Sequence, residues 1–471
     1  MKIYKSMRNF RLLILVMSTV CALSTYSQDY KSKFGLYGNL LSSGRYLEMS
    51  KVYTDKDSIN PFLKLNNKIV AAIANNQNRY AISLINDNLR YNWQAYGFDA
   101  LYLADVYFTL CKAEGLYDQE EALLEWLKQD YYPSQMIYYN DKKYTAATEK
   151  LISDEENSLK AKVLISPVHA IRKDESQAVK FSVNPIIRTK IKLNGETLDA
   201  IWTTELRYPL QITPQVADQL GIVCGKDSVA GCPVVYLDSI NIGNLQFNHV
   251  PALVSVMVDP TAYIKEHKLS RKYAKELKAF YTRINVPQIG LPIIRLLEKI
   301  AIDWKHQIIN FPTDTLPKAD FEESMYFAYP DFPALYLPVS INNEFAVGQI
   351  NLGNSDYIVV RDNFYKKCNF PSIKGKNITV LKNNRLFSVP LITLKSPSVL
   401  FGGHTVDSKK KLSVRSVNDR SSDVEIGLSF FKSLGQTVVF DFKQMKVQVW
   451  KKDRMFKLEV QFVKSVNFIF V

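Results

Sequence analysis

Two stretches of this chain follow one plan: KLNGETLDAIWTTE at residues 192–205 and SINNEFAVGQINLGN at residues 340–354. Each has an apolar-polar strand pattern, a turn of the Asn-Gly or Asn-Asn kind, and a second apolar strand. This pattern predicts a β-hairpin, because Asn and Gly tolerate the left-handed backbone that a two-residue turn requires. Nine residues separate Asn194 from Thr203, and nine separate Asn342 from Asn351.

A second match follows each hairpin. The first copy continues with QIGLPIIRLL at 288–297 and IAIDWKHQIINF at 300–311, and the second with EIGLSFFKSL at 425–434 and VVFDFKQMKVQV at 438–449. The glycine precedes the Asp by 13 residues in the first copy and by 14 in the second. Matched spacing at both ends predicts a tandem repeat of one folding unit.

The repeat resembles the aspartic peptidases, most closely their retropepsin-like units, over about 290 residues. In that family the second strand of the hairpin ends in an Asp-Thr/Ser-Gly triplet. Two such units face each other, so that two carboxylates share a proton and activate a water molecule. Here the corresponding triplets are Thr203-Thr204-Glu205 and Asn351-Leu352-Gly353, and neither Thr203 nor Asn351 is a carboxylate.

The resemblance also assigns structural roles. Gly290 and Gly427 are expected to brace the two triplet loops, and Asp303 and Asp441 fall on a structural strand. Three other carboxylates lie near the triplets, but none stands at a triplet position that could replace the missing pair: Asp199, Asp356 and Asp362.

Two further features leave alternatives open. Gly402 and Gly403 predict either a flap in the second unit or an ordinary turn. Cys224 and Cys232 flank a small loop and either form a disulfide or stay free thiols, since export would permit disulfides.

The N-terminus predicts a cleaved signal peptide: four basic residues precede an apolar run at 12–23, and small and polar residues follow to 28. The mature chain is therefore expected to be exported, periplasmic or at the cell surface, with no transmembrane segment. Residues 30–155 have helical spacing and resemble tetratricopeptide repeats weakly, and a plain helical bundle is the alternative.

The predicted fold is an α+β multidomain one, in which an N-terminal α-helical domain precedes two all-β, aspartic-peptidase-like lobes that form one bilobed unit. Residues 181–193, 240–247 and 252–258 are predicted strands, and 259–283 a charged helical or mixed insertion. The predicted boundaries are 1–27 for the signal peptide, 28–155 for the helical domain, 156–316 for the first lobe, 317–333 for a linker, 334–452 for the second lobe and 453–471 for a C-terminal strand and tail.

The charge distribution and the motifs of the sequence limit the kinds of binding partner and cofactor that can be expected. The net charge is +14, yet residues 28–155 hold 14 Lys/Arg against 17 Asp/Glu, so the excess lies in the β region. Anionic partners are one interpretation, but the lysines are scattered and only 409–411 form a cluster, which favours a solvated surface. The five dispersed histidines predict no metal site, and no cofactor or nucleic-acid motif is present.

These observations predict a protein that is not an enzyme and that binds an extended peptide or protein partner between its lobes. One alternative is an active aspartic endopeptidase with a non-standard catalytic pair. Another is an envelope-associated structural or glycan-binding protein, which the 12% aromatic content and the basic surface would suit.

Overall fold

The computed structural model describes residues 35–41, 45–52, 60–160, 170–172, 178–225, 228–229, 231–255, 260–266, 268–328, 334–382, 385–406, 412–415 and 422–452. Three predicted features lie outside these ranges: the signal peptide at 1–27, the lysine cluster at 409–411 and the C-terminal strand within 453–471.

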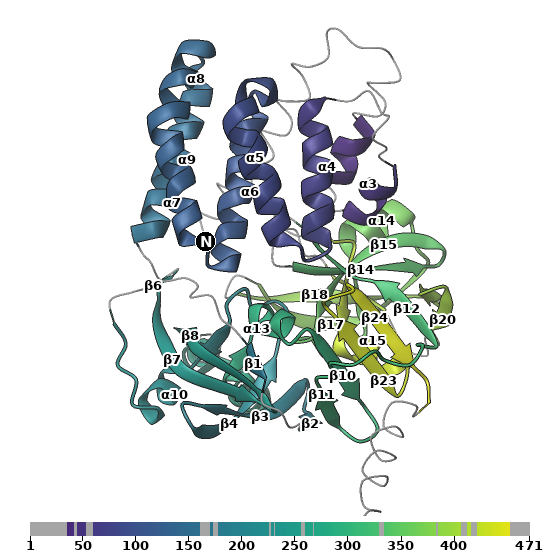
Figure 1. The fold of residues 1–471 in the computed structure, drawn as a ribbon. Coiled ribbons are helices and arrows are strands. Elements are labelled where there is room, and N and C mark those ends of the chain that lie inside the picture. The colour runs from purple at the N-terminus through teal and green to yellow at the C-terminus, as the bar shows by residue number, and fades with distance from the viewer. Residues whose placement is uncertain are drawn as a thin grey trace, which may run out of the picture. The chain divides into compact units, whose positions relative to one another are not determined.

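The chain folds into two compact units. One comprises residues 1–167 and 326–333, and the other comprises residues 168–325 and 334–471. Helices make up the first and strands dominate the second, which confirms the predicted α+β multidomain fold (Figure 1).

The first repeat of the β unit begins with the predicted hairpin. In it β3 (Ile187–Leu193) pairs with β4 (Glu196–Trp202) around the Asn194-Gly195 turn. The other elements of this repeat are β1 (Ala170–Arg172), β2 (Val179–Val183), β5 (Leu210–Ile212), α10 (Pro214–Gln219), β6 (Ser228–Val229), β7 (Cys232–Ile242), β8 (Leu245–Val254), α11 (Pro260–Glu266), α12 (Arg271–Ile284), β9 (Gln288–Ile289), α13 (Leu291–Leu296), β10 (Lys299–Asp303) and β11 (Ile308–Asn310).

The second repeat starts with the equivalent hairpin. There β14 (Ala334–Ile341) pairs with β15 (Glu344–Asn351) around Asn342-Asn343. The elements that follow are β16 (Ile358–Arg361), α14 (Asp362–Cys368), β17 (Ser372–Lys382), β18 (Arg385–Leu394), β19 (Val399–Phe401), β20 (His404–Val406), β21 (Ser413–Arg415), β22 (Val424–Gly427), α15 (Leu428–Leu434), β23 (Thr437–Asp441) and β24 (Lys446–Trp450).

Strands from both repeats join in one sheet. Its neighbouring strands run in the order β12-β24-β23-β10-β11-β2, where β12 is Phe321–Ser324. At the junction β10 pairs antiparallel with β23, from Lys299 opposite Asp441 to Asp303 opposite Thr437. Ala301, Val439 and Trp450 form a fully buried cluster there. The two repeats are therefore continuous in hydrogen bonding and in their core.

Three sequence predictions need correction. The predicted linker at 317–333 contains β12, which pairs with β24 because Phe321 is apolar and buries its ring. The predicted strand at 240–247 contains the turn at Gly243-Asn244 between β7 and β8, and the one at 181–193 contains the turn between β2 and β3. Both turns carry local signals, Gly243-Asn244 and Asn184-Pro185, so the sequence marks them even though the apolar pattern runs across each one.

In the helical unit α3 to α7 each contact the next helix in the chain, and α9 returns to contact α6, α7 and α8 (Figure 1). Asn60 caps α4, because its Oδ1 accepts from Phe62 N at 2.7 Å, and Gly115 ends α6 in the left-handed conformation. The helices are α3 (Tyr46–Val52), α4 (Pro61–Ala74), α5 (Asn78–Tyr96), α6 (Asp99–Glu114), α7 (Tyr117–Trp126), the π-helical segment Leu127–Tyr131, α8 (Tyr132–Tyr138) and α9 (Lys142–Lys160). Strand β13 (Tyr326–Ala328) contacts α3 and α4.

One lysine and two carboxyl groups are buried together in this unit. Lys112 Nζ on α6 lies 2.5 Å from Glu155 Oε2 on α9 and 3.8 Å from Glu120 Oε1 on α7. Burial raises the pKa of Glu120 to about 8, although Lys112 opposes the shift, and burial also raises the pKa of Glu155. A single ammonium therefore faces two carboxyl groups that cannot both ionise without a cost.

We expect the stability of the helical unit to fall with rising pH. Because folding raises the pKa of Glu120 above its unfolded value, its contribution is complete below about pH 4.5 and is lost as the pH approaches about 8. Glu120→Gln keeps the shape of the side chain and removes the charge. Its melting temperature should exceed that of the wild type by about 3–6 °C at pH 8.5 and differ little at pH 5.

Glu121→Gln is the matched control, since Glu121 is exposed on the same helix. Thermal unfolding followed by circular dichroism measures all three proteins. An identical pH slope in the wild type and in Glu120→Gln would exclude this role of the buried carboxyl group.

Candidate functional site

The turn of each hairpin is anchored in the same way. Asn194 and Asn342 both adopt positive φ, 45° and 50°. Asn194 N donates to Ser239 O at 2.9 Å, and Ser239 N donates back to Asn194 Oδ1 at 3.2 Å. Asn342 makes the same two bonds to Ser398, each at 2.8 Å. Asn is suited to both turns because it tolerates the left-handed conformation and offers a side-chain acceptor.

The strand that braces each hairpin has the same register in both repeats. β9 pairs in parallel with β4, and β22 pairs in parallel with β15. The partners are Ile201 with Gln288 and Trp202 with Ile289 in the first repeat, and Gln349 with Glu425 and Ile350 with Ile426 in the second. Thr203 and Asn351, one residue further along, therefore occupy equivalent positions, as the nine-residue spacing predicted.

Gly290 and Gly427 lie directly behind the triplet loops. A Cβ atom at 290 would lie 1.8 Å from Tyr208 O, and one at 427 would lie 2.3 Å from Asp356 O. The following peptide groups bind the loops, with Leu291 N donating to Leu206 O and Leu428 N donating to Asn354 O. Glycine is needed here for close approach and not for its φ, so the geometry agrees with a bracing role.

The two triplets meet at Gly353. A Cβ atom there would lie 2.6 Å from Thr203 Oγ1 and 3.2 Å from Asn351 Oδ1. Thr203 is 8% exposed and Asn351 is 5% exposed, so both side chains are buried where the repeats face each other. The hydroxyl of Thr203 accepts from Glu205 N at 3.3 Å within its own loop.

Thr204 links the repeats from one side. Its buried hydroxyl donates to Ile350 O at 2.6 Å and accepts from Leu352 N at 3.1 Å. The equivalent position in the second repeat is Leu352, whose side chain has no polar atom to return the bond. The link between the two triplets is therefore asymmetric.

A carboxylate does reach this centre, from a residue that the sequence analysis did not single out. Glu425 Oε1 accepts from Asn351 Nδ2 at 2.8 Å and from Asn354 Nδ2 at 2.6 Å. Arg361 Nη2 lies 3.8 Å from Glu425 Oε2. The sequence signal for Glu425 was its position two residues before Gly427. A strand residue beside the hairpin must face either the core or the triplet loop. The equivalent residue in the first repeat is the neutral Gln288.

The amide of Asn351 is oriented by Glu425. Since its Nδ2 donates to the carboxylate, its Oδ1 is left on the other side, where the part of the chain that the structure describes supplies no hydrogen-bond partner. The centre thus holds two hydroxyls, two amides and one carboxylate that already accepts two N–H groups. A second carboxylate to share a proton with it is absent among the described contacts of these residues.

The other carboxylates that the sequence raised are engaged elsewhere. Each forms an ion pair with a basic neighbour: Asp199 with Arg188 at 3.7 Å, Asp356 with Arg415 at 2.6 Å and Asp362 with Lys366 at 2.6 Å. Asp303 and Asp441 cap equivalent turns, because each Oδ1 accepts two backbone N–H groups.

The remaining predicted features have simple surroundings. Gly402 and Gly403, with φ of 54° and 75°, form the β19–β20 turn, and a Cβ atom at 402 would lie 2.6 Å from Glu322 O on β12. This is the packing of an ordinary turn, and a flap role for the two glycines stays a prediction. Cys224 and Cys232 are free thiols in the structure. Within the described ranges, no three His, Cys, Asp or Glu side chains gather as metal ligands, and no helix has the length and apolar character to cross a membrane.

Comparison with known proteins gave structural similarities and no match in sequence. No family model matches the chain, and no curated protein matches it in sequence. The chain is similar in structure to a retropepsin-like aspartic protease from Rickettsia conorii, with 11% identity over 31% of this chain and 96% of that one and a TM-score of 0.21. It is also similar to the protein edgp, with 11% identity over 58% of this chain and 94% of that one and a TM-score of 0.33.

Replacing Asn351 with Asp should destabilise the β unit at neutral pH. In Asn351→Asp a carboxylate replaces the amide that lies 2.8 Å from Glu425 Oε1, so the two carboxyl groups must share a proton and one pKa rises. A carboxyl group whose pKa is raised by folding contributes fully to the free energy of unfolding only at acid pH, and this contribution is lost as the pH rises. We expect a melting temperature about 2–6 °C below the wild type at pH 7.5, with the difference shrinking at pH 4.5.

Asn351→Ala serves as the control for that experiment. It removes the same hydrogen bond without adding a charge, so its deficit should not vary with pH. A pH-independent deficit in Asn351→Asp as well would contradict the proximity of the two groups.

Removing the Thr204 hydroxyl should weaken the junction of the repeats. Thr204→Val keeps the shape of the side chain but leaves Ile350 O and Leu352 N buried without partners, at a cost of about 1–3 kcal/mol. Thr203→Val is the control, because Thr203 Oγ1 accepts one longer bond from its own loop. Urea denaturation compares the two variants, and an equal loss of stability would argue against the link between repeats.

Proposed function

We propose that the β unit is a non-catalytic relative of the aspartic peptidases that binds an extended peptide or protein segment. The observation that carries this proposal is the pairing of Thr203 with Asn351 at the two facing positions of the repeat. The loops that present them keep their anchoring turns and bracing glycines, while neither residue can act as a carboxylate base. Export to the periplasm or cell surface is part of the proposal and rests on the predicted signal peptide.

Hydrolysis by this class of fold needs a base for water and an acid for the carbonyl oxygen. The hydroxyl of Thr203 ionises far too weakly to be that base. The Asn351 side chain is a neutral carboxamide, which acts neither as a base nor as an acid between pH 3 and pH 8. Glu425 Oε1 is already the acceptor of two amide N–H groups, so that oxygen does not offer a lone pair to a water molecule.

Peptide binding makes smaller demands on the site. An extended peptide gains its affinity mainly through main-chain hydrogen bonds to strand edges, and side-chain contacts add the specificity. Those bonds need a rigid β frame and no carboxylate pair. The equivalent registers of β4 with β9 and of β15 with β22 supply such a frame in both repeats.

A second candidate, an active endopeptidase with a non-standard catalytic group, is favoured by Glu425 alone. It is the carboxylate that touches Asn351, and its side chain is 15% exposed. In that alternative its second oxygen would have to take the proton of a water molecule despite Arg361 at 3.8 Å.

One experiment separates the two functions. The chain from residue 28 onward is incubated with a diverse tryptic peptide mixture between pH 3 and pH 8, and mass spectrometry measures both retained and cleaved peptides. We expect retention without cleavage by the wild type and by Glu425→Gln, because glutamine keeps an acceptor for Asn351 and Asn354. A variant with Ala at Asp199, Asp356 and Asp362 tests the remaining carboxylates.

Cleavage that disappears in Glu425→Gln would establish the endopeptidase instead, and cleavage lost only in the triple Ala variant would place the catalytic group elsewhere. A folded protein that neither retains nor cleaves peptides would overturn peptide binding.

A further inference from the structure

The first repeat carries an insertion that the second lacks in its described part. After β8 the chain forms α11 and α12 before it returns as β9, which agrees with the predicted helical insertion at 259–283. The corresponding interval of the second repeat lies between β21 and β22, because β16 pairs in parallel with β21 as β5 does with β8. It spans only residues 416–423, whereas residues 255–287 separate β8 from β9. The hairpin, brace and junction are shared by both repeats, so the insertion adds something that the folding of a repeat does not require.

Helix α12 has two distinct faces. Ala274, Leu277 and Tyr281 are partly or fully buried at helical spacing and attach the helix to the unit. Arg271, Lys275 and Lys278 are exposed at the spacing i, i+4, i+7, which places them along one side of the helix over about 10 Å. Ser270 begins the helix, because its Oγ accepts from Tyr273 N.

The exposed face is cationic among the residues that the structure describes, with Glu266 as the exposed acidic residue next to Lys265. Lys265 and Lys268 precede α12 and are also exposed. None of these five basic side chains forms an ion pair with any residue that the structure describes. Tyr273, which is 59% exposed, lies on the opposite side of α12 from Arg271, Lys275 and Lys278, because two residues correspond to about 200° of helix rotation.

We propose that this α12 cationic face, made of Arg271, Lys275 and Lys278 with Lys265 and Lys268, binds anionic lipid headgroups at a membrane surface. The face is a row of charges on a convex helix, with its apolar residues turned inward. Mobile headgroups can adjust to such a row, whereas an acidic protein partner would need a matching fixed surface.

The proposed contact is electrostatic and reversible. Each basic residue near an anionic surface strengthens binding by about fivefold at low salt, and the effect fades beyond the Debye length. Since the apolar face of α12 is engaged in the protein, we expect no deep insertion. This function is independent of peptide binding by the repeats, and either can fail without the other.

The test is vesicle co-sedimentation of the chain from residue 28 onward, which is the mature form that the predicted signal peptide implies. Vesicles of phosphatidylcholine alone are compared with vesicles containing about 30% phosphatidylglycerol, at about 50 mM and about 300 mM NaCl. We expect binding to the anionic vesicles at low salt and its loss at high salt.

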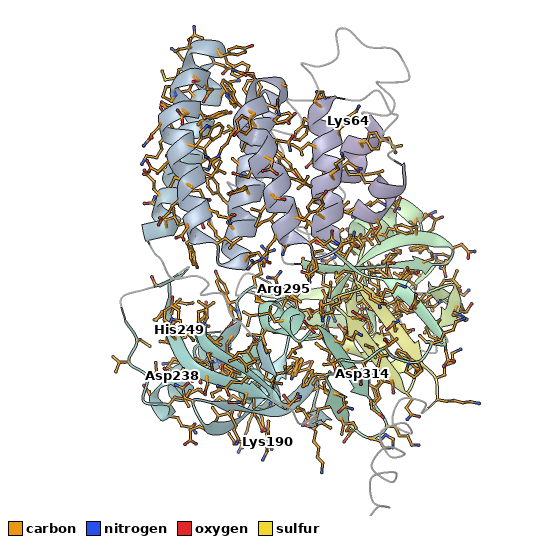
Figure 2. All side chains as sticks on the ribbon, in the orientation of Figure 1. Lys64, Lys190, Asp238, His249, Arg295 and Asp314 are labelled. Carbon is orange, nitrogen blue, oxygen red and sulfur yellow. The ribbon has the colours of Figure 1, made fainter. Side chains whose placement is uncertain are left out.

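The variant that decides the assignment replaces Arg271, Lys275 and Lys278 with Gln, and we expect it to bind at least tenfold more weakly. The matched control replaces Lys180, Lys190 and Lys192 with Gln, which removes the same charge from β2 and β3 of the same repeat. Figure 2 shows Lys190 on this strand surface. All three control lysines are exposed.

Equal weakening in the two variants would mean that net charge alone draws the protein to the vesicles, and it would overturn the assignment to α12. Absence of wild-type binding to the anionic vesicles at low salt would overturn the membrane proposal. Circular dichroism melts establish that both variants are folded.

Discussion

The antiparallel pairing of β10 with β23 is the constraint on which the rest of the β unit depends. It joins the penultimate strands of the two repeats, which lie far apart in sequence, and every residue of β23 is buried. Because each of these strands follows a bracing glycine and a short helix, their pairing also orients the two triplet loops. Thr203 can then face Asn351, and Thr204 can reach the backbone on both sides of Asn351.

The centre that results is a connected network of hydrogen bonds between polar groups of both repeats. Glu425 lies on β22 and accepts a hydrogen bond from Asn351 Nδ2, so the second repeat itself supplies the partner for the N–H group of this amide. A closely placed pair of carboxyl groups does exist in this protein, but Glu120 and Glu155 form it inside the helical unit around Lys112. There it is buried between helices.

Departures from symmetry show where the two repeats have specialised. Leu352 removes one of two equivalent links at the centre, Glu425 replaces a neutral glutamine, and α11 with α12 extends only the first repeat among the described residues. The shared features, by contrast, are those that backbone geometry enforces: left-handed turn residues, glycines at close contacts and Asp-capped turns. The proposed membrane contact uses a part that differs, so the charges of α12 can be changed by mutation without disturbing the common frame, whereas the proposed peptide contact relies on that frame.

The sequence by itself determined the repeat, its hairpins, the glycines behind the triplet loops and the absence of a carboxylate at positions 203 and 351, because all of these are local patterns of turn residues, apolar alternation and spacing. The turn at Gly243-Asn244 is also marked locally, whereas β12 inside the predicted linker depends on its partner β24 elsewhere in the chain. Only the tertiary structure decided that Glu425 contacts Asn351 and that Thr204 bridges the repeats. Such contacts join residues that lie more than 70 positions apart, and their existence depends on strand register and side-chain direction rather than on any local pattern.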